Sequence, residues 1–332
     1  GDPQPGGGGD PQPGGGGDPQ PGGGGDPQPS GGGDPQPSGG GVVLPLPKEK
    51  PKGVSVDFLC FEFQKQVKAV FPEYNNETTF EELGAWIWGS YNDRQKAGGP
   101  VNVVDLFGHK TMRKGGASLC DAIGRNSPDS VGDATIFISW AWQYCVRDFL
   151  VALGGYCLGQ NVDPKKTFCW ICFFNNNQHV WLQPGGVSNA VEIFESNVRM
   201  VGTVVVVLDK LDARLSIYFS RLWTIFEVYI AILNKLQIRI APMIAAAEEA
   251  VKLGARAIGH GGNNVFAKSL RELLEIDMKA ARASNPEDEA SIRRQVEQLG
   301  GSQPMYQTMT DAVVKAFVTS FGYGYLVEDG YL

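Results

Sequence analysis

An eight-residue unit, Gly-Asp-Pro-Gln-Pro-Gly/Ser-Gly-Gly, occurs five times in succession and fills the first 40 residues of the chain. With the residues that follow up to position 53, this opening contains 20 of the 44 glycines and 13 of the 21 prolines. Its apolar side chains are only Val42, Val43, Leu44 and Leu46. A segment that can bury so little apolar surface cannot offset the entropy lost on folding. We therefore predict that residues 1–53 form a disordered linker.

The repeat has two interpretations, a solvated tether and a multivalent ligand for a proline-binding groove. Each Pro-Gln-Pro sequence favours a short extended left-handed helix, whereas each glycine run restores flexibility. A period of eight residues is too short for a solenoid, and the lack of a three-residue period excludes collagen. We favour the tether.

The rest of the chain, 279 of 332 residues, has an ordinary share of Gly and Pro and enough apolar residues for a large core. The net charge is −7, and no run of Lys or Arg supplies the positive charge of a nucleic-acid groove. The best candidate for a membrane span, residues 134–153, is interrupted by Arg147 and Asp148. Six cysteines are too few for a disulfide scaffold. We expect a soluble cytoplasmic protein that binds neither nucleic acid nor membrane.

We predict a mostly helical segment over residues 54–130. Apolar residues recur at spacings of three and four over residues 56–71 and 78–91. Thr79 with Glu82, at the start of the second of these helices, is typical of a capping box. The aromatic residues Trp86 and Trp88 are expected to pack in the core rather than to line a site. A break at residues 98–100 and a loop over residues 110–116 are expected to follow.

From residue 131 the pattern changes to short apolar strands that alternate with helices, which is typical of a parallel sheet covered on both faces. The expected strands are residues 135–140, 167–174, 203–208, 236–242 and 276–280. Helices are expected over residues 144–153, after Ser188, after Ser220, and over residues 264–274, 286–299 and 304–319. The strand 203–208 should be central because both of its faces are apolar. The predicted fold class is α/β, with a doubly wound, mostly parallel sheet of about five strands over residues 131–320 and a tail over residues 321–332.

Several catalytic motifs are absent from the sequence. It contains no Gly-x-x-x-x-Gly-Lys-Ser/Thr, no Gly-x-Gly-x-x-Gly after a strand and no Gly-x-Ser-x-Gly, and it has only three histidines. Cys169 and Cys172 have the spacing of a redox pair but lie within the expected strand 167–174, where residues three apart point to opposite faces. We expect them to be buried structural thiols. The same geometry argues against a zinc site that includes His179, so no metal is expected.

Two polar stretches follow expected strands, at the edge where open α/β sheets bind ligands. The first is Asn-Asn-Asn-Gln-His at residues 175–179, which is equally well interpreted as a solvated loop with local side-chain turns. The second is Ser-Arg-Leu-Trp-Thr-Ile-Phe-Glu at residues 220–227, where Trp223 and Glu227 share one face of a helix. Glu227 interrupts a run of large apolar residues. Its carboxylate therefore faces solvent, pairs with a cation, or lies in a cleft with a chemical role.

The Ser-x-x-Trp-x-x-x-Glu pattern that ends at Glu227 resembles the motif of TIR domains. The sequence around this motif is similar to that of a TIR-like group found in long algal and protist proteins. Three features carry the similarity: the sequence Ile-Phe-Ile-Ser-Trp-Ala-Trp at residues 136–142, the polar loop 175–179 and the valine-rich third strand. Thr224 departs from the pattern, since these families usually have Cys there. The loop also lacks the acidic and glycine pattern of plant and animal TIR domains. The resemblance covers residues 131–319 and implies a TIR-like fold.

In catalytically active TIR domains, the glutamate matched by Glu227 is required to cleave NAD⁺ between nicotinamide and ribose. The resemblance thus implies a catalytic Glu227 and NAD⁺ as a substrate, with no cofactor. Nicotinamide leaves as a neutral molecule from a cationic glycoside, so one carboxylate can suffice to stabilise the developing oxocarbenium charge. The residues expected to bind substrate are Ser139, Trp140, Trp142, Asn177, His179, Ser220 and Trp223.

Many TIR domains are adaptors, and the sequence leaves this alternative open. The fold would then serve self-association on a flexible tether, and Glu227 would be a structural or exposed acid. The two hypotheses predict different geometries. An enzyme needs Glu227 in a cleft with residues 139–142 and 175–179, whereas an adaptor is expected to have this carboxylate in a salt bridge on an open surface.

Overall fold

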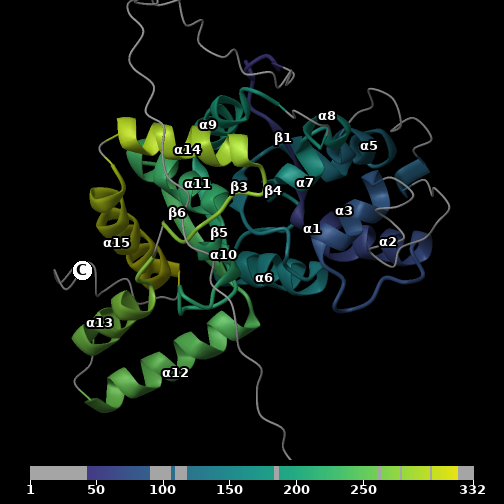
Figure 1. Ribbon diagram of the computed structural model, residues 1–332. Coiled ribbons are helices and arrows are strands. Elements are labelled where there is room, and N and C mark those ends of the chain that lie inside the picture. The colour runs from purple at the N-terminus through teal and green to yellow at the C-terminus, as the bar shows by residue number, and fades with distance from the viewer. Residues whose placement is uncertain are drawn as a thin grey trace, which may run out of the picture. The chain divides into compact units, whose positions relative to one another are not determined.

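The computed structural model describes residues 43–89, 106–108, 118–182, 187–260, 263–276, 279–299 and 301–320 (Figure 1). The predicted linker up to residue 42, the predicted tail 321–332, the expected break and the expected loop at 110–116 lie outside these residues. The described residues all belong to one compact unit, which includes both the expected helical segment and the expected α/β domain.

A six-stranded sheet with the order β2-β1-β4-β3-β5-β6 organises this unit. Its parallel strands are β3 (Ile136–Ser139), β4 (Phe168–Trp170), β5 (Thr203–Leu208) and β6 (Gln237–Pro242). β1 (Lys52–Ser55) runs antiparallel between β4 and β2 (Val131–Asp133). The prediction of an α/β fold with a mostly parallel sheet is therefore confirmed, with six strands in place of about five.

The helices cover both faces of the sheet. α6 (Val146–Gly159) connects β3 to β4, a step across the sheet towards β2. α9 (Ala190–Val201) precedes β5 and α11 (Leu222–Leu233) precedes β6, and these two connections step across the sheet towards the β6 edge. Because such crossovers are right-handed, α6 lies on one face and α9 and α11 lie on the other (Figure 1). β5 is central among the parallel strands, and its side chains from Val204 to Leu208 are completely buried, as its continuous apolar run predicted.

The remaining helices complete the unit, and among the described residues none combines the length and apolarity needed to cross a bilayer. They are α1 (Val56–Phe58), η1 (Leu59–Phe63), α2 (Gln64–Val70), α3 (Phe80–Trp88), η2 (Leu106–Gly108), α5 (Leu119–Asn126), η4 (Pro128–Ser130), α7 (Cys172–Asn175), α8 (Gln178–Trp181), α10 (Ile217–Ser220), α12 (Ile244–His260), α13 (Asn263–Leu273), α14 (Pro286–Gln298) and α15 (Ser302–Ser320). The capping box of Thr79 and Glu82 on α3 is confirmed.

Two expected strands differ in the structure. The strand expected over 167–174 ends at Trp170, because the chain turns into α7 where the Asn175 side chain accepts a hydrogen bond of 2.8 Å from the Ile171 N–H. No strand forms in the described part of residues 276–280. The outer edge of β6 is instead covered by α15, and the Ile240 N–H donates to the Ser320 hydroxyl at 3.0 Å.

Three expected helix ends were also wrong. α6 continues through Gly154 and Gly155, which occupy helical positions, and extends to Gly159. The N-cap of α9 is Asn189 rather than Ser188, and the N-cap of α11 is Arg221. Ser220 is the last residue of α10, and its hydroxyl donates to the Ile217 carbonyl at 2.7 Å instead of capping α11. A serine before an apolar run was therefore not a sufficient criterion for a helix start.

Gly53 explains how β1 fits into the sheet. A Cβ atom at this position would lie 2.8 Å from the backbone carbonyl of Cys169, closer than such atoms approach one another in folded proteins. The predicted end of the disordered linker at residue 53 was wrong, because Lys52 and Gly53 belong to β1. The strand was not expected because its pairing partners on β2 and β4 are remote in sequence.

We expect Gly53→Ala to lower the free energy of unfolding by roughly 1–3 kcal/mol, since the added methyl group would push β1 away from β4. Gly155→Ala is the matched control. It lies in α6 with no atom within 4 Å of the added methyl group, and it should stabilise the protein by up to about 1 kcal/mol. Urea denaturation of both variants measures the difference, and an unaltered midpoint for Gly53→Ala would contradict the close packing of β1.

Candidate functional site

Glu227 lies on α11 beside the carboxyl end of β3. Its side chain is buried, with 7% of its surface exposed. The Ser139 hydroxyl, on the last residue of β3, donates a hydrogen bond of 2.5 Å to the Glu227 carboxyl group. Ser139 is also 2.6 Å from the hydroxyl of Tyr218, which donates to the Thr224 carbonyl at 3.2 Å. Two residues predicted for the site, Ser139 and Glu227, are therefore in direct contact, and Tyr218 is a third member that was not predicted.

Burial raises the pKa of Glu227 to about 8, and the hydrogen bond from Ser139 offsets only part of this effect. Within the described part of the chain, Glu227 makes no salt bridge with Lys, Arg or His. The carboxyl group is consequently protonated at neutral pH in this conformation. Burial raises the pKa of the Cys172 thiol to about 12, and the charge of Glu227 adds to this effect.

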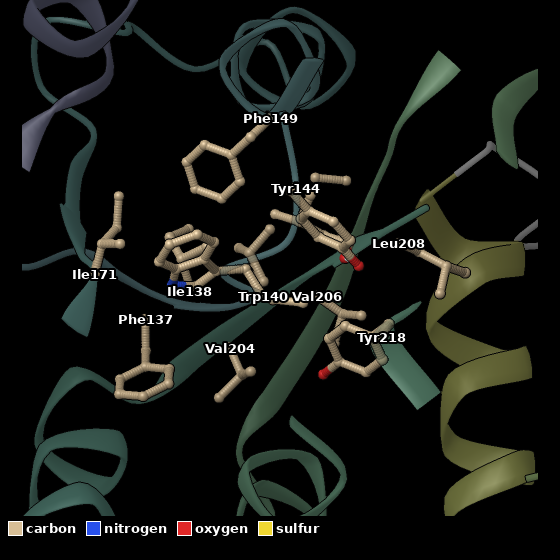
Figure 2. Packing of buried hydrophobic residues seen from close by; sticks show 14 of the residues in the cluster. Phe137, Ile138, Trp140, Tyr144, Phe149, Ile171, Val204, Val206, Leu208 and Tyr218 are labelled. Carbon is tan, nitrogen blue, oxygen red and sulfur yellow. The ribbon is translucent and has the colours of Figure 1, made fainter. Parts of the chain in front are cut away.

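Trp140 and Trp142 lie next to this network, immediately after Ser139. Their rings are stacked at 6.2 Å, and Trp140 also packs between Phe80 and Phe149, the latter visible in Figure 2. Trp140 is buried, and the side chains of Trp140 and Trp142 interact with the Cys172 thiol, which offsets part of the rise in its pKa.

The polar stretch 175–179 is folded into α7 and α8 rather than forming a solvated loop. Asn177 caps α8, and its side chain accepts a hydrogen bond of 3.2 Å from the His179 backbone N–H. Among the described residues, no group pairs with the buried Nε2 atom of the His179 imidazole, and burial lowers the pKa of this group. Helix capping thus gives Asn177 a structural role, whereas no structural partner accounts for the His179 Nε2 atom within the described residues.

Trp223 packs against the neighbouring helices α9 and α14. Its indole N–H donates to Asp288 of α14 at 3.2 Å, and its ring packs on Phe194 of α9 at 4.8 Å. Ser220 is engaged within α10, as described above. Trp223 and Glu227 are four residues apart on α11 and so share one face of this helix, as expected. The contacts of the Trp223 side chain are with α9 and α14.

Asp209 is a structural centre that the sequence analysis missed. It follows β5 directly, is buried, and accepts hydrogen bonds from Ser216 Oγ at 2.5 Å, Ile217 N at 2.8 Å, Tyr144 Oη at 3.2 Å and Tyr218 N at 3.3 Å. These bonds fix the start of α10 and so place the Tyr218 hydroxyl on Ser139. An acidic residue at the carboxyl end of the central strand was the sequence feature that could have indicated this role.

The cysteine prediction was right about the burial of Cys169, whereas Cys172 is half-buried, and it was wrong about local structure. Cys169 lies in β4 and Cys172 begins α7, so the pair spans a strand-to-helix turn instead of one strand. Both thiols are free, and burial raises the pKa of each, which disfavours the reactive thiolate. Among the residues that the structure describes, no cluster of His, Cys, Asp and Glu is suited to hold a metal ion.

A groove in the described structure lies away from Glu227. It has a volume of about 750 Å³ between η1 and α6, and none of the predicted site residues lines it. Exposed apolar side chains surround it: 67% of Phe61, 47% of Val151 and 85% of Leu158 are accessible to solvent. Glu227 therefore neither opens into this groove nor lies on an open surface. Its position matches neither the cleft expected for an enzyme nor the surface salt bridge expected for an adaptor.

Comparison with models of protein families, with curated proteins and with solved structures finds no match to this chain. The resemblance to TIR domains accordingly depends on the order and spacing of the sequence motifs.

Proposed function

We propose that the chain is a TIR-like signalling enzyme that cleaves the nicotinamide–ribose bond of NAD⁺ or a related nucleotide, with Glu227 as the essential carboxylate. The observation that carries the proposal is the buried Glu227 carboxyl group, which has no cationic partner in the described residues and is hydrogen-bonded to Ser139 at the carboxyl end of a parallel strand. Buried acids with strongly shifted pKa values are concentrated at functional sites. The carboxyl ends of such strands are where α/β sheets bind nucleotides.

The reaction requires the ionised form of Glu227. The bond between the ribose C1′ atom and the nicotinamide nitrogen breaks, and its electron pair leaves with nicotinamide. The oxocarbenium ion that remains is stabilised by the carboxylate, and water adds to C1′ and releases a proton. Ser139 and Tyr218 hold the carboxylate in place through their hydroxyl groups. Because Glu227 is covered in this structure, substrate entry requires the side chains around it to move.

We expect nicotinamide release from NAD⁺ by the full chain to increase as the pH rises through about 8, since the active form is the ionised carboxylate with its raised pKa. Glu227→Gln should reduce the rate at least about 100-fold, the usual effect of removing one such stabilising group. Glu195→Gln is the matched control, because it removes a partly exposed carboxylate that pairs with Arg199 on α9. The assay is a measurement of released nicotinamide between pH 6 and pH 9, values chosen to bracket that pKa.

Equal release by wild type and Glu227→Gln would remove Glu227 from the mechanism. The second candidate function, a self-association module without catalysis, is favoured by the exposed apolar groove between η1 and α6. It predicts no release from any of the three proteins, including assembled samples. The same assay therefore separates the two functions.

A further inference from the structure

The five residues from Val43 to Pro47, which come shortly after the repeats, are attached to α9 by an unusual contact; we call them the strap. The Leu44 N–H donates to Asn189 Oδ1 at 3.0 Å, and the Asn189 Nδ2 donates back to the Leu44 carbonyl at 2.7 Å. One amide side chain thus satisfies both backbone groups of a residue 145 positions away. Such a paired contact requires an extended backbone and is independent of the bound side chain.

The side chain of Leu44 enters a small apolar cluster that is separate from the main core. This cluster contains Val187, Ala190 and Ile193, and Leu44, Val180, Trp181 and Trp223 pack against it. We call the surface formed by Asn189 and these side chains, other than Leu44 itself, the strap groove. It combines apolar and aromatic walls with one polar group that binds backbone, which is the composition of sites for extended peptides.

The strap has the pattern of a polyproline-type segment. Leu44 and Pro47 are half-buried, whereas Val43 and Leu46 expose 73% and 51% of their surfaces. A spacing of three residues between buried positions matches the three residues per turn of the polyproline II helix, and Pro45 and Pro47 favour this conformation. The preformed helix loses little entropy on binding.

We propose that the strap groove is a binding site for an extended Leu-x-x-Pro peptide, and that residues 43–47 of the same chain occupy it as an intramolecular ligand. The groove lies at the N-terminal end of α9, which is the carboxyl edge of the sheet, because α9 ends where β5 begins. The strap thereby ties the end of the repeat region to the edge of the α/β unit. The proposal does not depend on catalysis by Glu227.

The test uses the full chain and a labelled peptide with the sequence of residues 42–48. Leu44→Asp should release the strap, and this variant is expected to bind the peptide at least about tenfold more tightly than wild type, in which the tethered strap competes at high effective concentration. Adding Asn189→Ala to Leu44→Asp should weaken binding at least about tenfold by removing the backbone contact. A peptide with the Leu-x-x-Pro spacing scrambled is the control ligand.

Hydrogen exchange of the Leu44 amide gives a second measurement that needs no mutation at Leu44. This amide should be protected in wild type and should lose its protection in Asn189→Ala, whereas Asn189→Asp, which keeps the acceptor oxygen, should retain part of it. Failure of a folded Leu44→Asp variant to bind the peptide, or exchange of the wild-type Leu44 amide at the rate of an unstructured chain, would overturn the proposal.

Discussion

The Glu227→Gln variant is expected to gain stability relative to wild type as the pH rises, by roughly 3 kcal/mol between pH 5 and pH 8. The folded-state pKa of Glu227 is raised from its ordinary value of 4.5 to about 8 by burial. Between these two values the folded protein retains a proton that the unfolded chain releases, so wild-type stability falls with increasing pH. Below pH 4.5 this penalty is absent, and above pH 8 it is complete. The glutamine side chain of the variant is neutral at every pH and carries no such penalty.

Denaturant unfolding of both proteins at several pH values measures the effect, since the difference between the two curves isolates Glu227 from the other titrating groups. Glu195→Gln again serves as the control, and its difference from wild type should stay nearly constant with pH because Glu195 is on the surface beside Arg199. Parallel curves for wild type and Glu227→Gln would show that the carboxyl group is solvated in the folded protein. Such a result would also remove the basis for the predicted rise in enzymatic rate.

If Glu227 acts as proposed, stability and activity conflict at this residue. The ionised carboxylate that the proposed mechanism requires is the same form that destabilises the closed fold. Natural proteins retain such costly groups chiefly where they have a function. The measured pH dependence therefore tests the structural cost independently of any substrate.

The elements that the sequence predicted best are those whose pattern is local. The strand 203–208 is apolar on both faces and is the buried β5, and the capping box of Thr79 and Glu82 begins α3 as expected. The helices near the end of the chain, α13, α14 and α15, also match their expected ranges to within a few residues. In each case, residues within one turn or one strand determine the structure.

One helix with a local pattern was missed, α12 (Ile244–His260), which none of the expected helices covers. The other differences depend on contacts between remote residues or on very short apolar segments. β1 contains only four residues and is stabilised by pairing with β2 and β4, more than 70 positions away. The strand ending at Trp170 was predicted to be longer because Phe173 and Phe174 are as apolar as strand residues, although they pack as part of α7. Apolar periodicity over so few residues does not distinguish a strand from a helical turn.

The candidate site was predicted in part. Ser139 and Glu227 were both expected, and they meet because β3 and α11 converge at the carboxyl edge of the sheet. Tyr218 and Asp209 were missed because their roles follow from the fold of the segment between β5 and α11, which sequence spacing does not reveal. Trp223 was assigned to the site from its helical spacing to Glu227 and from the resemblance to TIR domains, whereas its contacts are with α9 and α14.

Replacement of Asp209 is expected to have a large effect that reaches the candidate site. Asp209→Asn preserves the size of the side chain but presents an N–H₂ group to some of the four donors that now bind the carboxylate. Each buried donor left without an acceptor costs about 1–3 kcal/mol, so the variant should lose at least about 3 kcal/mol of stability. Asp212→Asn, three residues later, removes a carboxylate that binds the exposed Arg214 and should change stability by less than about 1 kcal/mol.

Urea denaturation of both variants compares the stability lost at the buried, hydrogen-bonded Asp209 with the stability lost at the surface ion pair of Asp212. If Asp209→Asn proves as stable as Asp212→Asn, the four hydrogen bonds do not determine the position of α10. If it is destabilised but still folded, the start of α10 should loosen and the Tyr218 hydroxyl should lose its fixed contact with Ser139. Nicotinamide release by the folded variant would then decrease with Ser139 and Glu227 both intact, because the hydroxyl pair that positions the carboxylate depends on Asp209 through α10.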